Sequence, residues 1–94
     1  MLHTVKYSPF ARHDLEQALA QMQHDDRLLL WQDAVIAVTV PVWQTRLQAL
    51  ADSGCLYVMQ EDLQARGLKH ELGEPVTMAG LVELVAKLGS PQAW

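Results

Sequence analysis

The side chains best suited to acid/base chemistry or binding follow three apolar segments of the sequence. They are Tyr7, Ser8, Gln32, Asp33, Gln60, Glu61 and Asp62. If the segments are parallel strands, their carboxyl ends meet at one edge of a sheet, where ligands and partners collect. Asp33 and Glu61 could then share acid/base work if burial kept one of them protonated at neutral pH. No nucleophile lies beside them, so we expect these carboxylates to cap helices or contact a partner.

Residues 60–68 predict a short helix with well-placed ends. Glu61 and Asp62 come where a helix exposes unpaired N–H groups, which favour negative charge. Arg66 falls in the last turn, where a cation is favourable, and Gly67 can adopt the left-handed conformation that closes a helix. We expect these four residues to be structural or interface residues.

Cys55 is the single cysteine of the chain, which excludes an internal disulfide and leaves one candidate for sulfur chemistry. A thiolate can accept sulfane sulfur when a helix N-terminus or a cation favours it. Cys55 instead opens a predicted strand at the amino edge of the sheet, with no cation beside it in the sequence. We therefore expect a structural cysteine, and a Cys55 persulfide carrier is the alternative.

Cofactor and metal sites are not predicted. The four histidines have no spacing that would gather metal ligands, and the five glycines form neither a dinucleotide fingerprint nor a phosphate loop. The three tryptophans are expected in the core or at an interface rather than as base-stacking platforms. Trp94 should pack against its own sheet or against a partner, because an unsupported terminal residue would be mobile.

Composition predicts one domain over residues 1–94 that works with protein partners. The chain is 50% hydrophobic and only 19% charged, which suggests that oligomerisation covers part of its surface. A net charge of -4 without a Lys/Arg cluster argues against direct nucleic-acid binding. The longest apolar tract, residues 34–43, is well short of the ~20 residues that span a bilayer. With no leader pattern at the start, we expect a cytoplasmic protein without a membrane segment.

Apolar runs alternate with helical periodicity, which is typical of a three-layer α/β fold with helices on both faces of a parallel sheet. Four strands are expected at residues 2–6, 28–31, 55–59 and 76–77. Four helices are expected at residues 9–23, 41–54, 61–66 and 81–88, the first capped by Ser8. Leu29, Leu30, Val58 and Leu63 should form the core.

The sequence resembles the TusB/DsrH family over essentially its full length. The segments that carry the resemblance occur in the family's order and spacing: MLHT at residues 1–4, SP at 8–9, LLLWQD at 28–33, EDLQARGL at 61–68 and QAW at 92–94. The resemblance implies a DsrE-like or flavodoxin-like topology. It departs locally from the family pattern at Asp25, Ala34 and Thr77, which concerns loop shapes and the fourth strand.

This resemblance implies a subunit of a sulfur relay that is not catalytic alone. TusB-like subunits join TusC-like and TusD-like subunits in a dimer of heterotrimers, and persulfide sulfur passes through a TusE-like acceptor to 2-thiolation of the wobble uridine of tRNA. The persulfide cysteine of that complex belongs to the TusD-like subunit. Some DsrH members, which work in sulfur oxidation, carry a cysteine where this chain has Ala18, so the resemblance favours the tRNA branch.

Several alternatives stay open at this point. The chain could serve the sulfur-oxidation branch, or it could be a small flavodoxin-like ligand-binding module that uses the carboxyl edge. The isolated chain could also pair into a homodimer.

Overall fold

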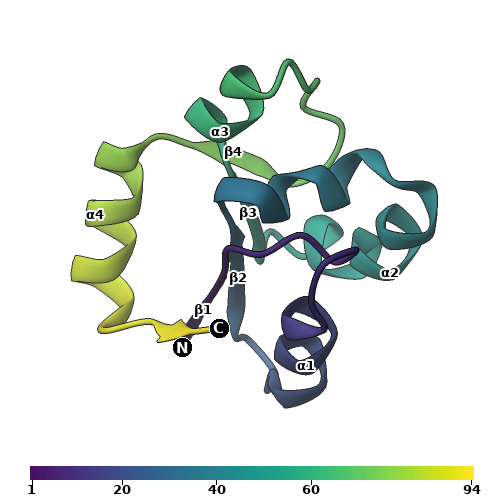
Figure 1. The fold of residues 1–94 in the computed structure, drawn as a ribbon. Coiled ribbons are helices and arrows are strands. Elements are labelled where there is room, and N and C mark those ends of the chain that lie inside the picture. Colours follow the sequence, from purple (N-terminus) through teal and green to yellow (C-terminus); the bar gives the residue numbers. More distant parts are fainter.

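Five parallel strands form one sheet in the order β4-β3-β2-β1-β5. Figure 1 shows this arrangement in the computed structural model, which describes all residues from 1 to 94. The predicted α/β class with a parallel sheet is confirmed. The strands are β1 (Leu2–Val5), β2 (Arg27–Leu30), β3 (Leu56–Met59), β4 (Glu74–Val76) and β5 (Gln92–Ala93).

Helices cover the sheet on both faces, as expected. In Figure 1, α1, η1 and α2 lie on one side of the sheet and α4 lies on the other. From β1 to β4, each new strand is added on the same side of the preceding strand, whereas the chain returns through α4 to add β5 on the other side of β1. Because crossovers between parallel strands are right-handed, this reversal places α4 on the face opposite to α1 and α2. The helices are α1 (Asp14–Gln21), the 3₁₀ helix η1 (Gln32–Thr39), α2 (Pro41–Asp52), α3 (Gln60–Ala65) and α4 (Met78–Leu88).

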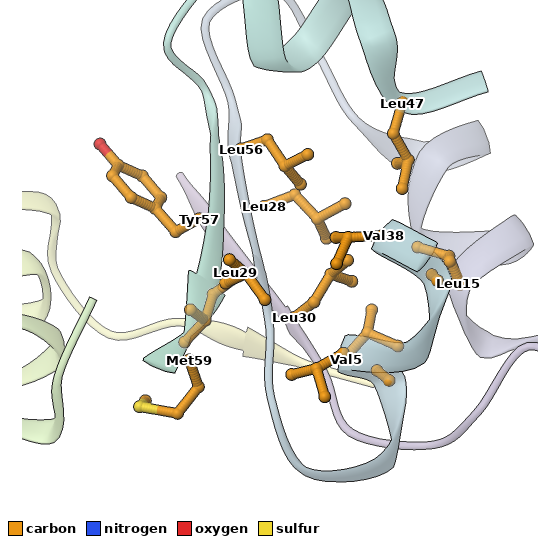
Figure 2. Packing of buried hydrophobic residues seen from close by; sticks show 14 of the residues in the cluster. Val5, Leu15, Leu28, Leu29, Leu30, Val38, Leu47, Leu56, Tyr57 and Met59 are labelled. Atoms are coloured by element: carbon orange, nitrogen blue, oxygen red, sulfur yellow. The ribbon is translucent and has the colours of Figure 1, made fainter. Parts of the chain in front are cut away.

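The core fills both faces of the sheet, because β3 and residues 28–30 of β2 are apolar at every position. Figure 2 shows Leu28, Leu30 and Leu56 pointing toward the side of α1, η1 and α2. Tyr57 and Met59 point the opposite way, toward α4. The four predicted core residues are confirmed as buried: Leu29, Leu30 and Val58 are 0% exposed and Leu63 is 3% exposed.

The predicted start of the first helix is wrong. Ser8 and Pro9 belong to a separate turn, in which the Ser8 hydroxyl accepts a hydrogen bond from the Phe10 N–H at 3.1 Å. The Ser8 carbonyl also accepts from the N–H groups of Ala11 and Arg12, both at 3.0 Å. This turn satisfies the groups that a helix start would have used, so α1 begins only at Asp14.

Two further elements, η1 and β5, were not predicted. η1 occupies the apolar tract before Pro41, and it buries Ala34, Val35, Ala37 and Val38. β5 has only two residues and pairs with β1 through His3–Gln92 and Thr4–Ala93. The fourth strand lies at Glu74–Val76 rather than at residues 76–77, and Cys55 lies just before β3 rather than within it.

Candidate functional site

Arg66 connects two elements at the carboxyl edge of the sheet. Its guanidinium donates to Asp33 Oδ1 from Nη2 at 2.8 Å and from Nε at 3.2 Å. Arg66 Nη1 lies 3.5 Å from Asp62 Oδ1 and donates to the Asp62 carbonyl at 3.2 Å. The end of α3 is thereby tied to the start of η1.

Asp62 also holds the turn between β2 and η1. The backbone N–H of Gln32 donates to Asp62 Oδ2 at 2.7 Å. Gln32 has a φ of +50°, in the left-handed region that residues other than glycine seldom occupy. The carboxylate therefore stabilises a strained residue at the carboxyl end of a central strand, a bond that links positions 30 residues apart.

Glu61 caps a helix other than its own. Its Oε2 accepts a hydrogen bond from the Met78 N–H at 3.1 Å, at the first residue of α4. Thr77 caps the same helix through a bond from the Gly80 N–H to its hydroxyl, also at 3.1 Å. Glu61 and Asp62 lie in the first turn of α3, as predicted, but α3 has no side-chain cap, and each carboxylate bonds to a neighbouring element instead. The β3 strand ends where Met59 leads directly into α3, so both carboxylates can reach neighbouring elements.

The end of α3 follows the predicted pattern. Gly67 has a φ of +65°, and its N–H donates to the Gln64 carbonyl at 3.1 Å. The Leu68 N–H donates to the Leu63 carbonyl at 2.9 Å, which completes a Schellman motif. Leu68 packs against the core beside Leu63, so packing holds this short helix in place.

The geometry does not support an acid/base pair at this edge. Asp33 is 67% exposed and ion-paired with Arg66, so it lacks the burial that the acid/base role required. Glu61 accepts a hydrogen bond from the Met78 N–H at the N-terminus of α4. Carboxylates held in this way order the edge and leave the negative charge of Asp33 accessible to a partner.

Basic side chains surround Tyr7 beside this edge. Arg12 Cζ lies 4.2 Å and Lys6 Nζ 5.3 Å from the centroid of the Tyr7 ring. Both distances suit cation–π contacts, which hold the loop after β1 together with the Ser8 turn. Phe10, on the same loop, is 70% exposed.

Cys55 lies at the opposite, amino end of the sheet. It is half-buried, and its Sγ lies 3.8 Å from the Ser53 carbonyl oxygen. Its carbonyl accepts from the Leu28 N–H at 2.8 Å, which continues the pairing of β2 with β3. The nearby guanidinium of Arg27 is bound by the Tyr57 hydroxyl, which raises the pKa of Arg27 above its usual value, with a smaller contribution from Cys55. The thiol is thus separated from the carboxyl edge by the length of β3.

A second polar cluster lies at the amino end, where sequence reasoning treated the histidines as isolated. His3 is 4% exposed and lies between Asp26 and Trp94. In the parallel pairing of β1 with β2, Leu2 lies opposite Arg27, which brings His3 near Asp26. The contact between His3 and Asp26 could therefore have been predicted only from the register of these two strands. The structure places Trp94 against its own sheet, where it is partly buried.

Neither a metal site nor a membrane helix is present in the structure. No three His, Cys, Asp or Glu side chains gather closely enough to hold a metal ion. The helices are all too short or too polar to cross a membrane.

Comparison with known proteins assigns the family. The model of the family described as "DsrH like protein" matches residues 7–90, which is most of the sequence, and the chain therefore belongs to the DsrH-like family. Its relatives include proteins named TusB. The chain is 38% identical to Protein TusB of Erwinia tasmaniensis over 98 residues, with 100% of both chains covered. It is 33% identical to Protein TusB of Klebsiella pneumoniae over 99 residues, again with 100% of both covered. Protein TusB of Pectobacterium atrosepticum is 36% identical over 86 residues, which cover 90% of this chain and 87% of that relative.

Proposed function

We propose that this chain is a non-catalytic subunit of a sulfur relay complex in the cytoplasm, with residues 1–94 acting as one domain. The observation that carries the proposal is the full-length similarity to proteins named TusB. In the TusB/DsrH family such subunits join TusC-like and TusD-like subunits in a dimer of heterotrimers. The complex delivers persulfide sulfur to a TusE-like acceptor for 2-thiolation of the tRNA wobble uridine.

A supporting rather than catalytic role agrees with the carboxyl edge of the sheet. The polar residues there bond to one another or to backbone groups: Arg66 to Asp33, Asp62 to the Gln32 N–H and Glu61 to the Met78 N–H. A catalytic acid or base needs a reactive atom free to meet a substrate. The edge is built instead as an ordered surface that a neighbouring subunit can contact.

Exposed apolar side chains support the assembly part of the proposal. Phe10 is 70% exposed, Val82 67%, Val42 62% and Met78 49%. These residues lie on several elements, and the low charged content of the chain agrees with a surface that partners cover. A subunit with two different neighbours needs more than one such contact area.

Ala18 favours the tRNA branch over sulfur oxidation. This residue stands where some DsrH members carry a cysteine, and it is completely buried on the inner face of α1. The chain therefore offers no thiol at that position. The one thiol present, Cys55, lies at the amino end of the sheet.

Native mass spectrometry tests the proposal. The chain is co-expressed with TusC-like and TusD-like proteins, and the mass of the purified intact complex is measured. We expect a dimer of heterotrimers that contains two copies of this chain. A well-behaved monomer that does not co-purify with either relative would overturn the assembly. In a strain that lacks the chain, loss of wobble-uridine thiolation supports the tRNA branch, whereas normal thiolation contradicts it.

A further inference from the structure

Trp94 contacts His3 at the amino end of the sheet, and the proposed function does not use this pair. β5 lies beside β1, and the Trp94 N–H donates to the Thr4 carbonyl at 2.9 Å. The indole Nε1 donates to His3 Nδ1 at 3.2 Å, with the two ring centroids 6.3 Å apart. The side chain of Trp94 thus helps to hold β5, which has only two residues, both exposed, against β1.

The hydrogen bond to the indole defines the protonation state of His3. An indole N–H can only donate, so His3 Nδ1 must carry a free lone pair. The other ring nitrogen, Nε2, lies 2.9 Å from Asp26 Oδ2, and it carries the proton that this carboxylate accepts. Docked Trp94 therefore requires a neutral His3 protonated at Nε2.

Asp26 is ionised and firmly held. It accepts from the Gln23 N–H at 2.9 Å, and the amine of Met1 lies 3.1 Å from its other oxygen. The Gln23 N–H and the His3 side chain hold the pKa of Asp26 well below its usual range. Asp26 thus stays negative over the pH range in which histidines titrate.

Solvent can deliver a proton to this site. A cavity of about 370 Å³ opens beside it, lined by Met1, His3, Gln21, Gln23, Asp26, Gln92 and Trp94. Asp26 and the Met1 amine are the charged groups facing His3, and the three glutamines from α1, the following turn and β5 are neutral. The Nε2–H bond to Asp26 persists in both protonation states of the ring.

We propose that protonation of His3 releases Trp94 and β5 from the edge of β1. A proton on Nδ1 removes the lone pair that the indole N–H uses and sets two donors against each other. Trp94 then loses its side-chain bond in a partly buried contact, where an unpaired donor is unfavourable. β5 is then held only by the backbone bonds of its two residues and of Trp94, too few to hold a strand in place. The strand acts as a latch that opens on acidification and uncovers the outer edge of β1.

Tryptophan fluorescence tests the latch. The variant W31F/W43F leaves Trp94 as the reporter, and its emission and acrylamide quenching are followed from about pH 8 to about pH 5. We expect a reversible red shift and stronger quenching on acidification, with one proton taken up and no change in the far-ultraviolet circular dichroism of the helices. A constant Trp94 emission over this range would overturn the proposal.

The matched control is His3→Asn in the same background. The Asn Oδ1 can accept the indole N–H in place of Nδ1, but the side chain does not titrate in this range. We expect Trp94 emission to stay at its docked value at every pH. An acid-induced shift of equal size in His3→Asn would show that another group controls Trp94, and it would refute the latch.

A measurement on the unaltered chain needs no replacement of Trp31, Trp43 or His3. In ¹⁵N-labelled protein, the indole N–H resonance of Trp94 is assigned by its absence in Trp94→Phe. We expect this resonance to move to the position of a free indole on acidification, while those of Trp31 and Trp43 stay in place. An unchanged Trp94 resonance, or equal movement of all three, would contradict the proposal.

Discussion

Arg66 Nη2 lies 2.8 Å from Asp33 Oδ1, although the two residues are 33 positions apart in the sequence. The pair joins the end of α3 to the start of η1 across the carboxyl edge of the sheet. Because Arg66 is 33% and Asp33 67% exposed, solvent and salt screen the attraction.

A double-mutant cycle of Arg66→Ala and Asp33→Ala should give a coupling of only ~0.2–1 kcal/mol in urea unfolding. The coupling should shrink further at high salt. Arg66→Ala alone should lower the free energy of unfolding more than Asp33→Ala, since Arg66 also contacts Asp62. A salt-independent coupling above ~2 kcal/mol would contradict this reading of an exposed pair.

Replacing Gln32 by glycine should raise the free energy of unfolding by up to ~1 kcal/mol. Its φ of +50° is strained for a side chain with a Cβ, and glycine relieves that strain while its greater flexibility in the unfolded chain offsets part of the gain. The bond from the N–H of residue 32 to Asp62 is a backbone bond and survives the change.

Gln17→Gly is the matched control for this substitution. Gln17 is exposed within α1, where φ is right-handed, so glycine should lower the free energy of unfolding by ~1 kcal/mol. Urea midpoints of the two variants should therefore move in opposite directions. Equal destabilisation by both would show that the turn at Gln32 is not strained.

Truncating Leu29 to alanine should cost ~2–5 kcal/mol, because this residue is 0% exposed at the centre of the sheet. Val82 lies on α4 and is 67% exposed. Val82→Ala should therefore change the free energy of unfolding by no more than ~0.5 kcal/mol in the isolated chain. Thermal melting separates the two, since ~1 kcal/mol corresponds to ~4–8 °C in a domain of this size. Similar melting temperatures for both variants would contradict the observed core.

Asp26 should make the chain more stable above its ordinary pKa of 3.8 than below it. Its folded pKa is lowered, first by the Gln23 N–H and then by His3, so the unfolded chain binds the proton more readily. This stabilisation is present above pH 3.8 and is lost as pH falls toward the folded pKa. Urea unfolding measured across this window should therefore show a steep loss of stability on the acid side.

Asp26→Asn should flatten that acid slope and lower stability at neutral pH. The control is its neighbour Asp25→Asn, which removes a carboxylate that is 87% exposed and lies outside the His3 cluster. We expect Asp25→Asn to keep the slope of the unaltered chain. The assignment to Asp26 fails if both variants keep the same slope.

Cys55→Ser should leave sulfur transfer by the assembled complex intact, because the thiol is at the amino end of β3 and away from the carboxyl edge. Mass spectrometry of the complex after exposure to a sulfur donor should find no added sulfur atom on this chain. The Cys55 carrier hypothesis gains support if Cys55 acquires such an adduct and the serine variant also loses tRNA thiolation.

Strands and helix ends that have a signal in adjacent residues were predictable from the sequence. The run from Leu28 to Leu30 is apolar on both faces and became the central strand β2. Gly67 ends α3 with a φ of +65°, as its position after Arg66 indicated. The carboxyl edge followed from the strands, since parallel order brings their ends together.

Contacts that depend on register or on distant partners were not predictable. Ser8 followed by Pro9 is a good helix start, but the chain uses Ser8 for a turn, and local propensity could not decide between the two. Glu61 caps α4 because β4 brings Met78 close to α3, a tertiary relationship without a sequence signal. β5 is too short for an alternating pattern, and only its pairing with β1 shows that it is a strand.

The strand order β4-β3-β2-β1-β5 also sets how the chain can assemble during synthesis. β2, β3 and β4 each emerge from the ribosome next to a partner that is already made, so the sheet can grow strand by strand. The outer edge of β1 waits for Gln92 and Ala93, which are translated after every other strand. An unpaired strand edge is a template for aggregation, and nascent chains expose such edges. The outer edge of β1 therefore stays unpaired on the nascent chain until the residues after α4 have been made, and an exposed edge of this kind favours aggregation in the meantime.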